Sequence, residues 1–426
     1  MSRFRRRLMG LAALRQAKAD DYVRVEYIEN TSNAYINTGL ICNSNYQFYI
    51  DVLLKTLDRT NFIFGGRRKN NVIDSNSNYS MGLYVNANNN FGSMMVRSSS
   101  VYTDYTVEAD KRYTISGDPN ALTISYMGID EETQEEIEQS FVLSIGGAVT
   151  TYGQPLYIFN TYQPTINANN ALIGRIYKFQ IKNASGTLIR DYIPMYQVST
   201  DTYGLWDRVN EEFYTSPNGV KFTGGERVIA DANDNLYYFR NYIVTANNTK
   251  VCSIGIQPNA TDTFEAKIYF PSTGRNYAFG AWSSNNNNAY GLIAISSTLR
   301  FQYHSGTINY SGTYSQRTFT FKEIFDDETQ TMHFYIFDAN GKQIFHNSVG
   351  KRGGTSSRAM LIGDFNGSSY GSVSGTRFYY FKYKRNQELI RDMIPVQSVE
   401  TGEYGLLDKV NLKIYYSTGG TPFTGA

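Results

Sequence analysis

The residues best suited to binding a ligand lie in one short loop that combines an aromatic side chain with amides. Trp282 is followed by two serines and four asparagines, among them Asn285 and Asn286. A pyranose ring stacks on an exposed aromatic face, while its hydroxyls bond to amides and hydroxyls. The loop therefore predicts an outward glycan site at these three residues. The alternative is an ordinary loop whose tryptophan packs against the protein.

The corresponding loop earlier in the chain has a different character. It begins with Arg67 and Arg68, continues with a lysine and two asparagines, and contains no aromatic residue. We expect these two arginines to meet an acidic neighbour or an acidic glycan, so the two loops have diverged.

Residue patterns for catalysis or metal binding are weak. Glycoside hydrolysis needs two carboxylates at a fixed separation, but the acids of residues 130–138 are clustered in what we expect to be a loop or short helix. His333 and His346 are expected to face each other across a hairpin, without a matched serine or cysteine. The two cysteines, Cys42 and Cys252, are expected to be buried apolar residues. No CxxC, HExxH or spaced acidic calcium loop occurs, so we expect no enzyme activity, cofactor or metal.

Residues 1–21 are basic and have a helical composition. We expect this segment to anchor the protein on a partner, with a short apolar run buried against that partner. The alternatives are a solvated helix, a nucleic-acid-binding arm or a targeting segment. The residues expected to pair with an acidic surface are Arg3, Arg5, Arg6 and Arg7, and those expected to be buried are Leu8, Leu11 and Leu14.

The rest of the chain contains a duplication. Residues 188–225 and 389–426 align without a gap at an offset of 201, and 20 of the 38 positions are identical. A period of this length is a whole domain. In both copies we expect the proline (Pro194, Pro395) to end a strand. We expect the repeated Arg-Asp pair (Arg190 and Asp191, then Arg391 and Asp392) to make charge-assisted bonds that fix the sheet.

Strand patterns dominate both halves. Aromatic residues make up 15% of the chain, including 36 tyrosines and 25 phenylalanines, and such residues favour pleated surfaces. Tyr177, Phe179 and Ile181 alternate with polar residues, as expected for one inward face, and Tyr379, Phe381 and Tyr383 repeat the pattern. We predict an all-β chain of two tandem antiparallel β-sandwiches, residues 22–226 and 236–426, joined by a linker at 227–235.

These features together resemble a known group of folds. The openings around Tyr27 and Tyr35, the Phe-Gly-Gly turn at 64–66 and the repeated tail resemble concanavalin A-like, laminin-G-type jelly rolls. The arginine-rich start resembles openings of virion proteins from bacteriophages of gut Bacteroidetes, including crAss-like phages. The resemblance implies two packed antiparallel sheets used for adhesion, glycan binding or virion decoration.

We therefore expect a non-enzymatic structural protein of a phage virion, made in the host cytoplasm and placed on the capsid surface or tail. Residues 1–21 would hold it to capsid or other virion proteins. The first alternative is a host-adhesion protein that binds cell-surface glycans, and the second is a polysaccharide hydrolase. The net charge of +2 resides in the N-terminal segment, which argues against nucleic-acid binding by the sandwiches. No apolar run is long enough to span a bilayer. No heptads occur, so a homo-oligomer would form through sandwich faces or the N-terminal segment.

Overall fold

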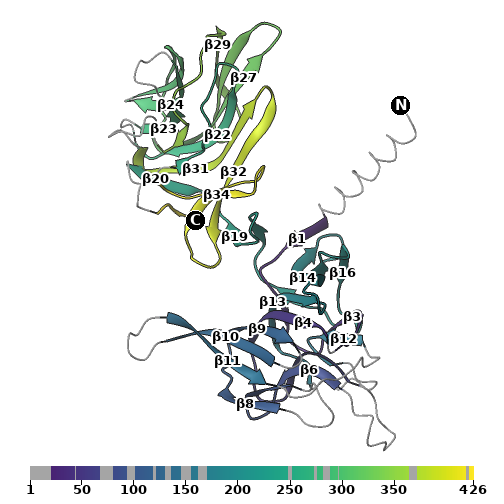
Figure 1. The fold of residues 1–426 in the computed structure, drawn as a ribbon. Helices are drawn as coiled ribbons and strands as arrows, with labels where there is room; N and C mark the ends of the chain where they lie inside the picture. Colours follow the sequence, from purple (N-terminus) through teal and green to yellow (C-terminus); the bar gives the residue numbers. More distant parts are fainter. Residues whose placement is uncertain are drawn as a thin grey trace, which may run out of the picture. The chain divides into compact units, whose positions relative to one another are not determined.

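The structure is a computed structural model. It describes residues 21–43, 45–67, 80–93, 101–118, 121–129, 136–144, 155–161, 170–247, 252–272, 276–281, 288–295, 297–363, 372–418 and 422–426. The chain divides into two compact units, unit 1 (Met1–Arg227) and unit 2 (Val228–Ala426) (Figure 1).

Unit 1 consists of two antiparallel sheets. Its larger sheet has the order β11-β10-β9-β4-β13-β14-β15-β16, with β1 on β14, β2 on β13 and β17 on β2. These strands are β1 (Tyr22–Arg24), β2 (Ile28–Asn30), β4 (Gln47–Leu54), β9 (Arg112–Asp118), β10 (Ala121–Ile129), β11 (Glu136–Ser144), β13 (Gly174–Lys182), β14 (Leu188–Gln197), β15 (Thr202–Asp207), β16 (Glu212–Tyr214) and β17 (Thr223–Gly224). The smaller sheet has the order β3-β12-β5-β6-β7-β8: β3 (Ile36–Ile41), β12 (Pro155–Ile158), β5 (Asn61–Arg67), β6 (Ser80–Val85), β7 (Asn90–Ser93) and β8 (Val101–Thr106).

Unit 2 repeats this arrangement. Its larger sheet has the order β18-β19-β32-β31-β22-β27-β28-β29, with β20, β33, β34 and β35 attached beside β31 and β32. These strands are β18 (Val228–Ala230), β19 (Leu236–Phe239), β20 (Ile243–Asn247), β22 (Thr263–Phe270), β27 (Arg317–Asp326), β28 (Thr331–Phe337), β29 (Gln343–Gly350), β31 (Ser372–Arg385), β32 (Glu388–Ser398), β33 (Tyr404–Asp408), β34 (Lys413–Tyr415) and β35 (Thr424–Gly425). The smaller sheet has the order β21-β30-β23-β24-β25-β26: β21 (Cys252–Ser253), β30 (Leu361–Ile362), β23 (Asn276–Ala281), β24 (Ala289–Ile295), β25 (Thr298–His304) and β26 (Gly306–Ser311).

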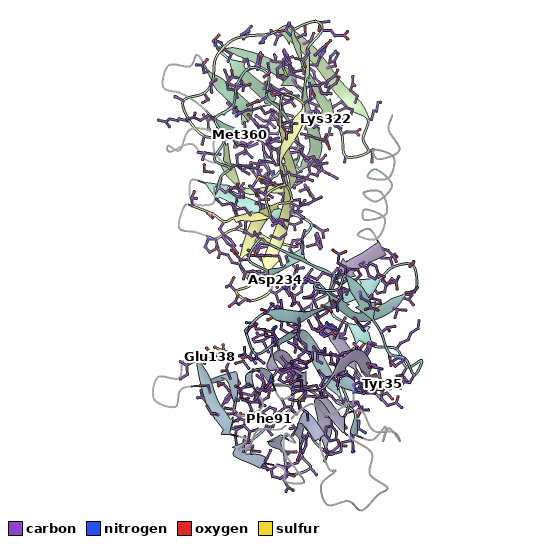
Figure 2. All side chains as sticks on the ribbon, turned by 45° about the vertical axis from the view of Figure 1, so that its right-hand side comes forward. Tyr35, Phe91, Glu138, Asp234, Lys322 and Met360 are labelled. Carbon is purple, nitrogen blue, oxygen red and sulfur yellow. The ribbon has the colours of Figure 1, made fainter. Side chains whose placement is uncertain are left out.

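Aromatic side chains from both sheets meet in the core of each unit. In unit 1 the ring of Phe64, from the smaller sheet, lies 4.9 Å from Phe48 and 5.3 Å from Phe179, both from the larger sheet. In unit 2 Phe279 lies in the same way 4.4 Å from Phe264 and 5.1 Å from Phe381. The side chains that fill each unit are drawn in Figure 2. The predicted pair of antiparallel β-sandwiches is therefore confirmed.

A β-bulge corrects one part of the predicted inward face. The register of β13 against β4 shifts between Ile176 and Lys178, so Ile176 and Phe179 both point into the core, with Tyr177 between them. Tyr177 instead packs on the outer face, where the Arg112 guanidinium lies 3.8 Å from its ring centre. An extra residue in one strand interrupts the alternation of faces.

The same bulge occurs in unit 2. Ile268 pairs with Phe378, and Lys267 pairs with Tyr380, so Tyr379 is the extra residue. Its ring lies 5.7 Å from that of Tyr242 instead of pointing inward. Alternation alone could not reveal a bulge at this point, although Phe179, Ile181, Phe381 and Tyr383 face the core as predicted.

The two prolines of the repeat do not end a strand as predicted. Pro194 lies within β14 and Pro395 within β32. The carbonyl of Pro194 accepts a hydrogen bond from Val25 N at 3.2 Å, and that of Pro395 accepts one from Arg240 N at 3.1 Å. On this side, β14 pairs first with β13 and then with β1, and β32 pairs first with β31 and then with β19. Each proline lies where the partner strand changes, so its missing N–H costs little hydrogen bonding there.

Two other segments also differ from expectation. The predicted linker at 227–235 forms β18 and the turn to β19, in which Val228 pairs with Tyr238. Asp231 N and Asn235 O close this turn at 3.0 Å. In the acidic stretch at 130–138, residues 136–138 belong to strand β11 and not to a loop or helix. The rest of that stretch lies outside the described residues.

Candidate functional site

The repeated tail forms the same charged clamp in both units. In unit 1 the carboxylate of Asp207 is fully buried, and its Oδ1 accepts the backbone N–H groups of Asp191 and Val209, each at 3.0 Å. Arg190 Nε lies 3.4 Å from Asp207 Oδ2, and Arg208 Nη2 lies 2.7 Å from Asp191 Oδ2. The two ion pairs therefore connect β14 to the end of β15.

Unit 2 reproduces these contacts. Asp408 Oδ1 accepts the N–H groups of Asp392 at 2.9 Å and Val410 at 3.1 Å, and Arg391 Nε lies 3.4 Å from Asp408 Oδ2. Lys409 replaces the second arginine, 3.2 Å from Asp392. Arg391 Nε and Asp408 Oδ2, like Arg190 Nε and Asp207 Oδ2, are buried without a hydrogen-bond partner among the described residues, so each pair is held by its opposite charges. The ion pairs and the backbone hydrogen bonds to Asp207 and Asp408 together fix the sheet, as predicted.

Most of the residues predicted to bind partners lie outside the described part of the chain. Arg67 ends β5, but the position of its side chain is not among those described. The residues outside the described ranges are Arg68, Trp282, Asn285 and Asn286 of the two loops, and Arg3, Arg5, Arg6, Arg7, Leu8, Leu11 and Leu14 of the N-terminal segment. Their predicted roles remain predictions.

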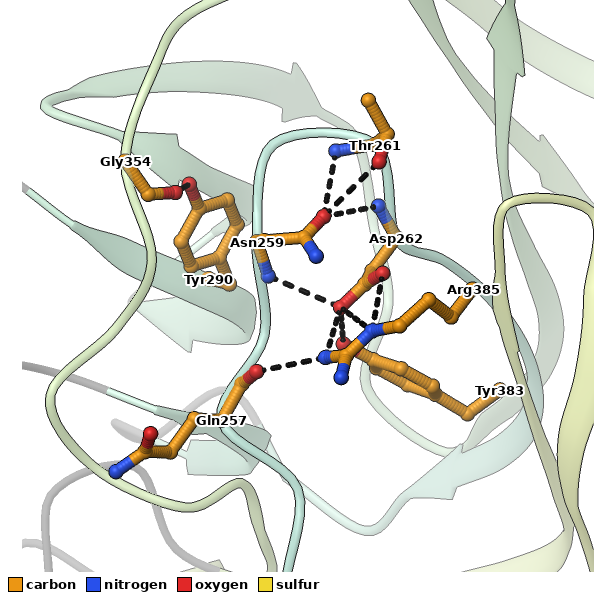
Figure 3. A network of polar contacts seen from close by, with 8 residues as sticks. All are labelled: Gln257, Asn259, Thr261, Asp262, Tyr290, Gly354, Tyr383 and Arg385. Atoms are coloured by element: carbon orange, nitrogen blue, oxygen red, sulfur yellow. Dashed lines mark hydrogen bonds and ion pairs between the residues drawn. The ribbon is translucent and has the colours of Figure 1, made fainter.

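The rim of unit 2 around Asp262 contains a dense polar network (Figure 3). The carboxylate of Asp262 is 2% exposed and accepts hydrogen bonds from Tyr383 Oη at 2.5 Å and from Asn259 N at 3.0 Å. Arg385 also donates to it, from Nη2 at 2.7 Å and from Nε at 3.0 Å. Burial, followed by the neighbouring Asp262 charge, raises the pKa of the Tyr383 hydroxyl, which keeps it a donor.

This rim also borders the predicted tryptophan loop. Tyr290 Oη donates to Gly354 O at 2.6 Å. A Cβ added to Gly354 would lie 2.1 Å from Asn288 Oδ1, so Asn288, the first described residue after the loop, packs closely on the chain at Gly354. The donors and acceptors around Asp262 are satisfied by one another, which makes this network a support for the rim.

Glu323 is the least satisfied group near this network. Its side chain points into the core, and Oε1 has no hydrogen-bond partner among the described residues. Burial raises the pKa of Glu323 well above its usual value, and the nearby Asp262 charge acts in the same direction. In the strand pairing, Ile115 of unit 1 corresponds to Phe321 of unit 2. Two residues further along each strand, Gly117 therefore corresponds to Glu323, so unit 1 has no acid at this position.

A second candidate site lies on the smaller sheet of unit 1. It is a shallow pocket of about 620 Å³. The described lining residues are neutral, with three asparagines, two threonines, one alanine and one tyrosine: Thr60, Asn86, Ala87, Asn88, Asn90, Tyr102 and Thr103. Tyr102 is 48% exposed. The pocket thus combines an aromatic surface with amides and hydroxyls.

Cross-strand packing holds the Tyr102 ring in place. Tyr84 Oη donates to Tyr102 Oη at 3.0 Å, and the two rings meet edge to face at 6.1 Å. Gly92 pairs with both tyrosines across the sheet. A Cβ on Gly92 would lie 2.7 Å from the Tyr84 ring and 2.9 Å from the Tyr102 ring, so glycine is required for this packing.

A tight turn holds the amides of the pocket. Asn86 Oδ1 accepts the backbone N–H groups of Asn88 and Asn90, each at 2.9 Å. Asn89 has a positive φ of 62°, which asparagine tolerates better than most residues. Asn90 Nδ2 donates to Tyr105 O at 3.1 Å and so connects the turn to β8.

Unit 2 has no equivalent of this pocket at the matching described positions. The positions that correspond to Tyr84, Gly92 and Tyr102 in the strand pairing are Ile293, Arg300 and Asn309. Arg300 Nε donates to Asn309 Oδ1 at 3.1 Å, where unit 1 has its aromatic surface. None of the residues predicted from the sequence to bind a ligand belongs to this pocket. The sequence signal for the pocket was the asparagine cluster at 86–90, but the tyrosine that completes the pocket, Tyr102, lies on a different strand, β8.

Within the described ranges, no group of three or more His, Cys, Asp and Glu residues could hold a metal ion. The described residues also contain no helix that is long and apolar enough to cross a membrane. Cys42 and Cys252 are buried free thiols, as predicted.

Comparisons with known proteins give distant similarities only. No model of a known protein family matches the sequence, and no curated protein matches it. Among solved structures, the chain is similar to domains LG4-5 of the mouse laminin alpha1 chain, with 10% identity, a TM-score of 0.28 and coverage of 90% of this chain and 91% of that one. It is also similar to the LG1-3 region of the laminin alpha2 chain, with 11% identity, a TM-score of 0.27 and coverage of 85% and 62%. The fold assignment rests on the strand pairing described above.

Proposed function

We propose that this chain is a non-enzymatic protein of a phage particle that displays two lectin-like sandwiches and binds a neutral glycan through the Tyr102 pocket of unit 1. The observation that carries the glycan part is the pocket itself. An exposed, rigidly held tyrosine stands beside three asparagines and two threonines. This is the chemistry by which a sugar ring stacks while its hydroxyls are recognised.

The composition of the pocket defines the class of ligand. None of the described lining residues is charged, so these residues offer an ionic ligand no opposite charge. A volume of about 620 Å³ lies within the usual range for small-ligand sites and suits a mono- or disaccharide segment of a longer glycan. The described lining residues also include no carboxylate, whereas glycoside cleavage uses a pair of them. These features support binding in preference to hydrolysis.

The placement on a virion rests on sequence features. The arginine-rich segment 1–21 would pair with acidic capsid or other virion proteins and bury its leucines there. Immunogold labelling of purified particles with an antibody against residues 22–426 tests this part. Label on particles is expected, and its position on head or tail separates decoration from host adhesion. Label found only on cells would make the chain a cell-surface adhesin.

Glycan binding is tested separately on an array of neutral and acidic glycans with the purified full chain. We expect retention of neutral structures with exposed hexose faces. Retention of acidic glycans alone would contradict the assignment, because it would direct attention to the basic loop at Arg67 and Arg68.

A further inference from the structure

The outer face of unit 2 contains a pair of histidines that the proposed function does not use. His333 lies on β28 and His346 on the neighbouring β29. His346 pairs directly with Tyr335, which alternates with His333 on the same face. Met332, Phe334 and Ile336 occupy the opposite face in the core. Both imidazoles are therefore directed toward solvent.

The two rings are held close together and nearly parallel. His333 Nδ1 lies 3.1 Å from His346 Nε2, and the ring planes differ by 13°. The Tyr335 ring packs 4.6 Å from that of His346 at an angle of 14°, which limits the rotation of that imidazole. A ligand pair ordered in this way loses little side-chain entropy when it binds an ion.

The separation of the nitrogens suits a shared transition-metal ion. Imidazole nitrogen binds Zn²⁺ at about 2.0–2.1 Å. Two nitrogens 3.1 Å apart can both reach that distance with an N–Zn–N angle of about 98°. This angle lies between the values for tetragonal and tetrahedral coordination, so the backbone would need little adjustment.

We propose that His333 and His346 form a two-histidine site for a late first-row divalent cation of the Zn²⁺ and Cu²⁺ class. Imidazole ligands favour these ions over Mg²⁺ or Ca²⁺. Both contacting nitrogens must be unprotonated, so the proton that the neutral pair shares moves to a ring nitrogen on the far side. Water fills the remaining coordination positions. This proposal is independent of glycan binding by unit 1.

The neighbouring groups on this face also fit a cation. Asp326 ends β27, two residues after Ile324, which pairs with His333 on the neighbouring strand. Lys322, the nearby cation on the same strand, is paired with Glu265 at 3.1 Å. The site therefore has an acidic group nearby, and the neighbouring positive charge is largely neutralised.

The test is Zn²⁺ titration of the tag-free, metal-stripped full chain by isothermal calorimetry. We expect one saturable site per chain, and at least tenfold weaker binding in each of His333→Gln and His346→Gln. His304→Gln is the matched control, because His304 is the third histidine of the chain and the one described hydrogen-bond contact of its ring is to the adjacent Ser305, at 3.1 Å. The control should bind like the wild type, and MgCl₂ should give no saturable heat.

Cu²⁺ electron paramagnetic resonance adds a direct readout of the ligands. Hyperfine coupling to two imidazole nitrogens is expected in the wild type and to one in each single variant. Unchanged melting temperatures show that the variants remain folded. The proposal is overturned if Zn²⁺ does not bind saturably, or if His346→Gln binds it as tightly as the wild type.

Discussion

Removal of the Arg385 guanidinium should expose how unit 2 tolerates a buried charge. The Asp262 carboxylate is 2% exposed, whereas the Arg385 side chain is 38% exposed. Arg385→Ala therefore leaves a charge in the protein without its cation, which typically costs about 3–5 kcal/mol. Tyr383 and Asn259 still donate to the carboxylate, so we expect a value near 3 kcal/mol.

A second substitution in the same background gives a test of sign. The hydrogen bonds from Tyr383 and Asn259 both end on Asp262 Oδ2, whereas Oδ1 receives Arg385 Nε. In Asp262→Asn, the side-chain oxygen can still accept the hydrogen bonds from Tyr383 and Asn259. Its NH₂ group can then point into the space that the Arg385 guanidinium occupied. The substitution removes the unpaired charge, so the double variant should be more stable than Arg385→Ala alone.

The assay is unfolding of the full chain in urea and by heating. The chain has two tryptophans, one in each unit, so a Trp206→Phe background makes Trp282 the reporter of unit 2. A loss of about 3 kcal/mol corresponds to a fall in Tm of roughly 6–12 °C for a unit of this size. The reasoning is refuted if Arg385→Ala costs less than about 1 kcal/mol, or if Asp262→Asn destabilises it further.

Three further predictions concern other buried groups. Burial raises the pKa of Glu323 in the folded state, so the contribution of this residue to stability is complete at low pH and declines as the pH rises through that pKa. Glu323→Gln should therefore flatten the pH dependence of the unit 2 melting temperature between pH 4 and 8. Asp408→Asn should cost about 1–3 kcal/mol by weakening two backbone hydrogen bonds and the Arg391 ion pair, measured as the fall in unit 2 urea midpoint against Asp327→Asn, an exposed control. Burial raises the pKa of the Cys42 and Cys252 thiols to about 12, so a disulfide reagent at pH 8 should react with neither until the chain is denatured.

The sequence predicted the sandwich fold because its evidence is local and repeated. Alternating side chains mark strands, and the repeated tail places the same Arg-Asp clamp in both units. The predicted strand ends at the two prolines and the predicted inward orientation of Tyr177 and Tyr379 were wrong. Both features depend on which strand pairs with the one that contains these residues. A change of ladder partner or a bulge leaves no mark in the pattern of a single strand.

The Tyr102 pocket could not be read from one stretch of sequence. Its aromatic surface needs Tyr84, Gly92 and Tyr102 in one row across three strands, and that row depends on the pairing register. The histidine pair was simpler, because His333 and His346 lie on β28 and β29, the two consecutive strands of one hairpin. Their facing arrangement was predicted and is confirmed.

The most direct test of the proposed glycan site is calorimetric titration of the full chain with the glycan that the array selects. We predict that Tyr102→Ala weakens binding at least tenfold, about 1.4 kcal/mol, without lowering the Tm of unit 1 by more than a few degrees. Asn309→Ala, at the matching place in unit 2, should bind like the wild type. Equal affinity of Tyr102→Ala and the wild type would contradict glycan binding by this pocket.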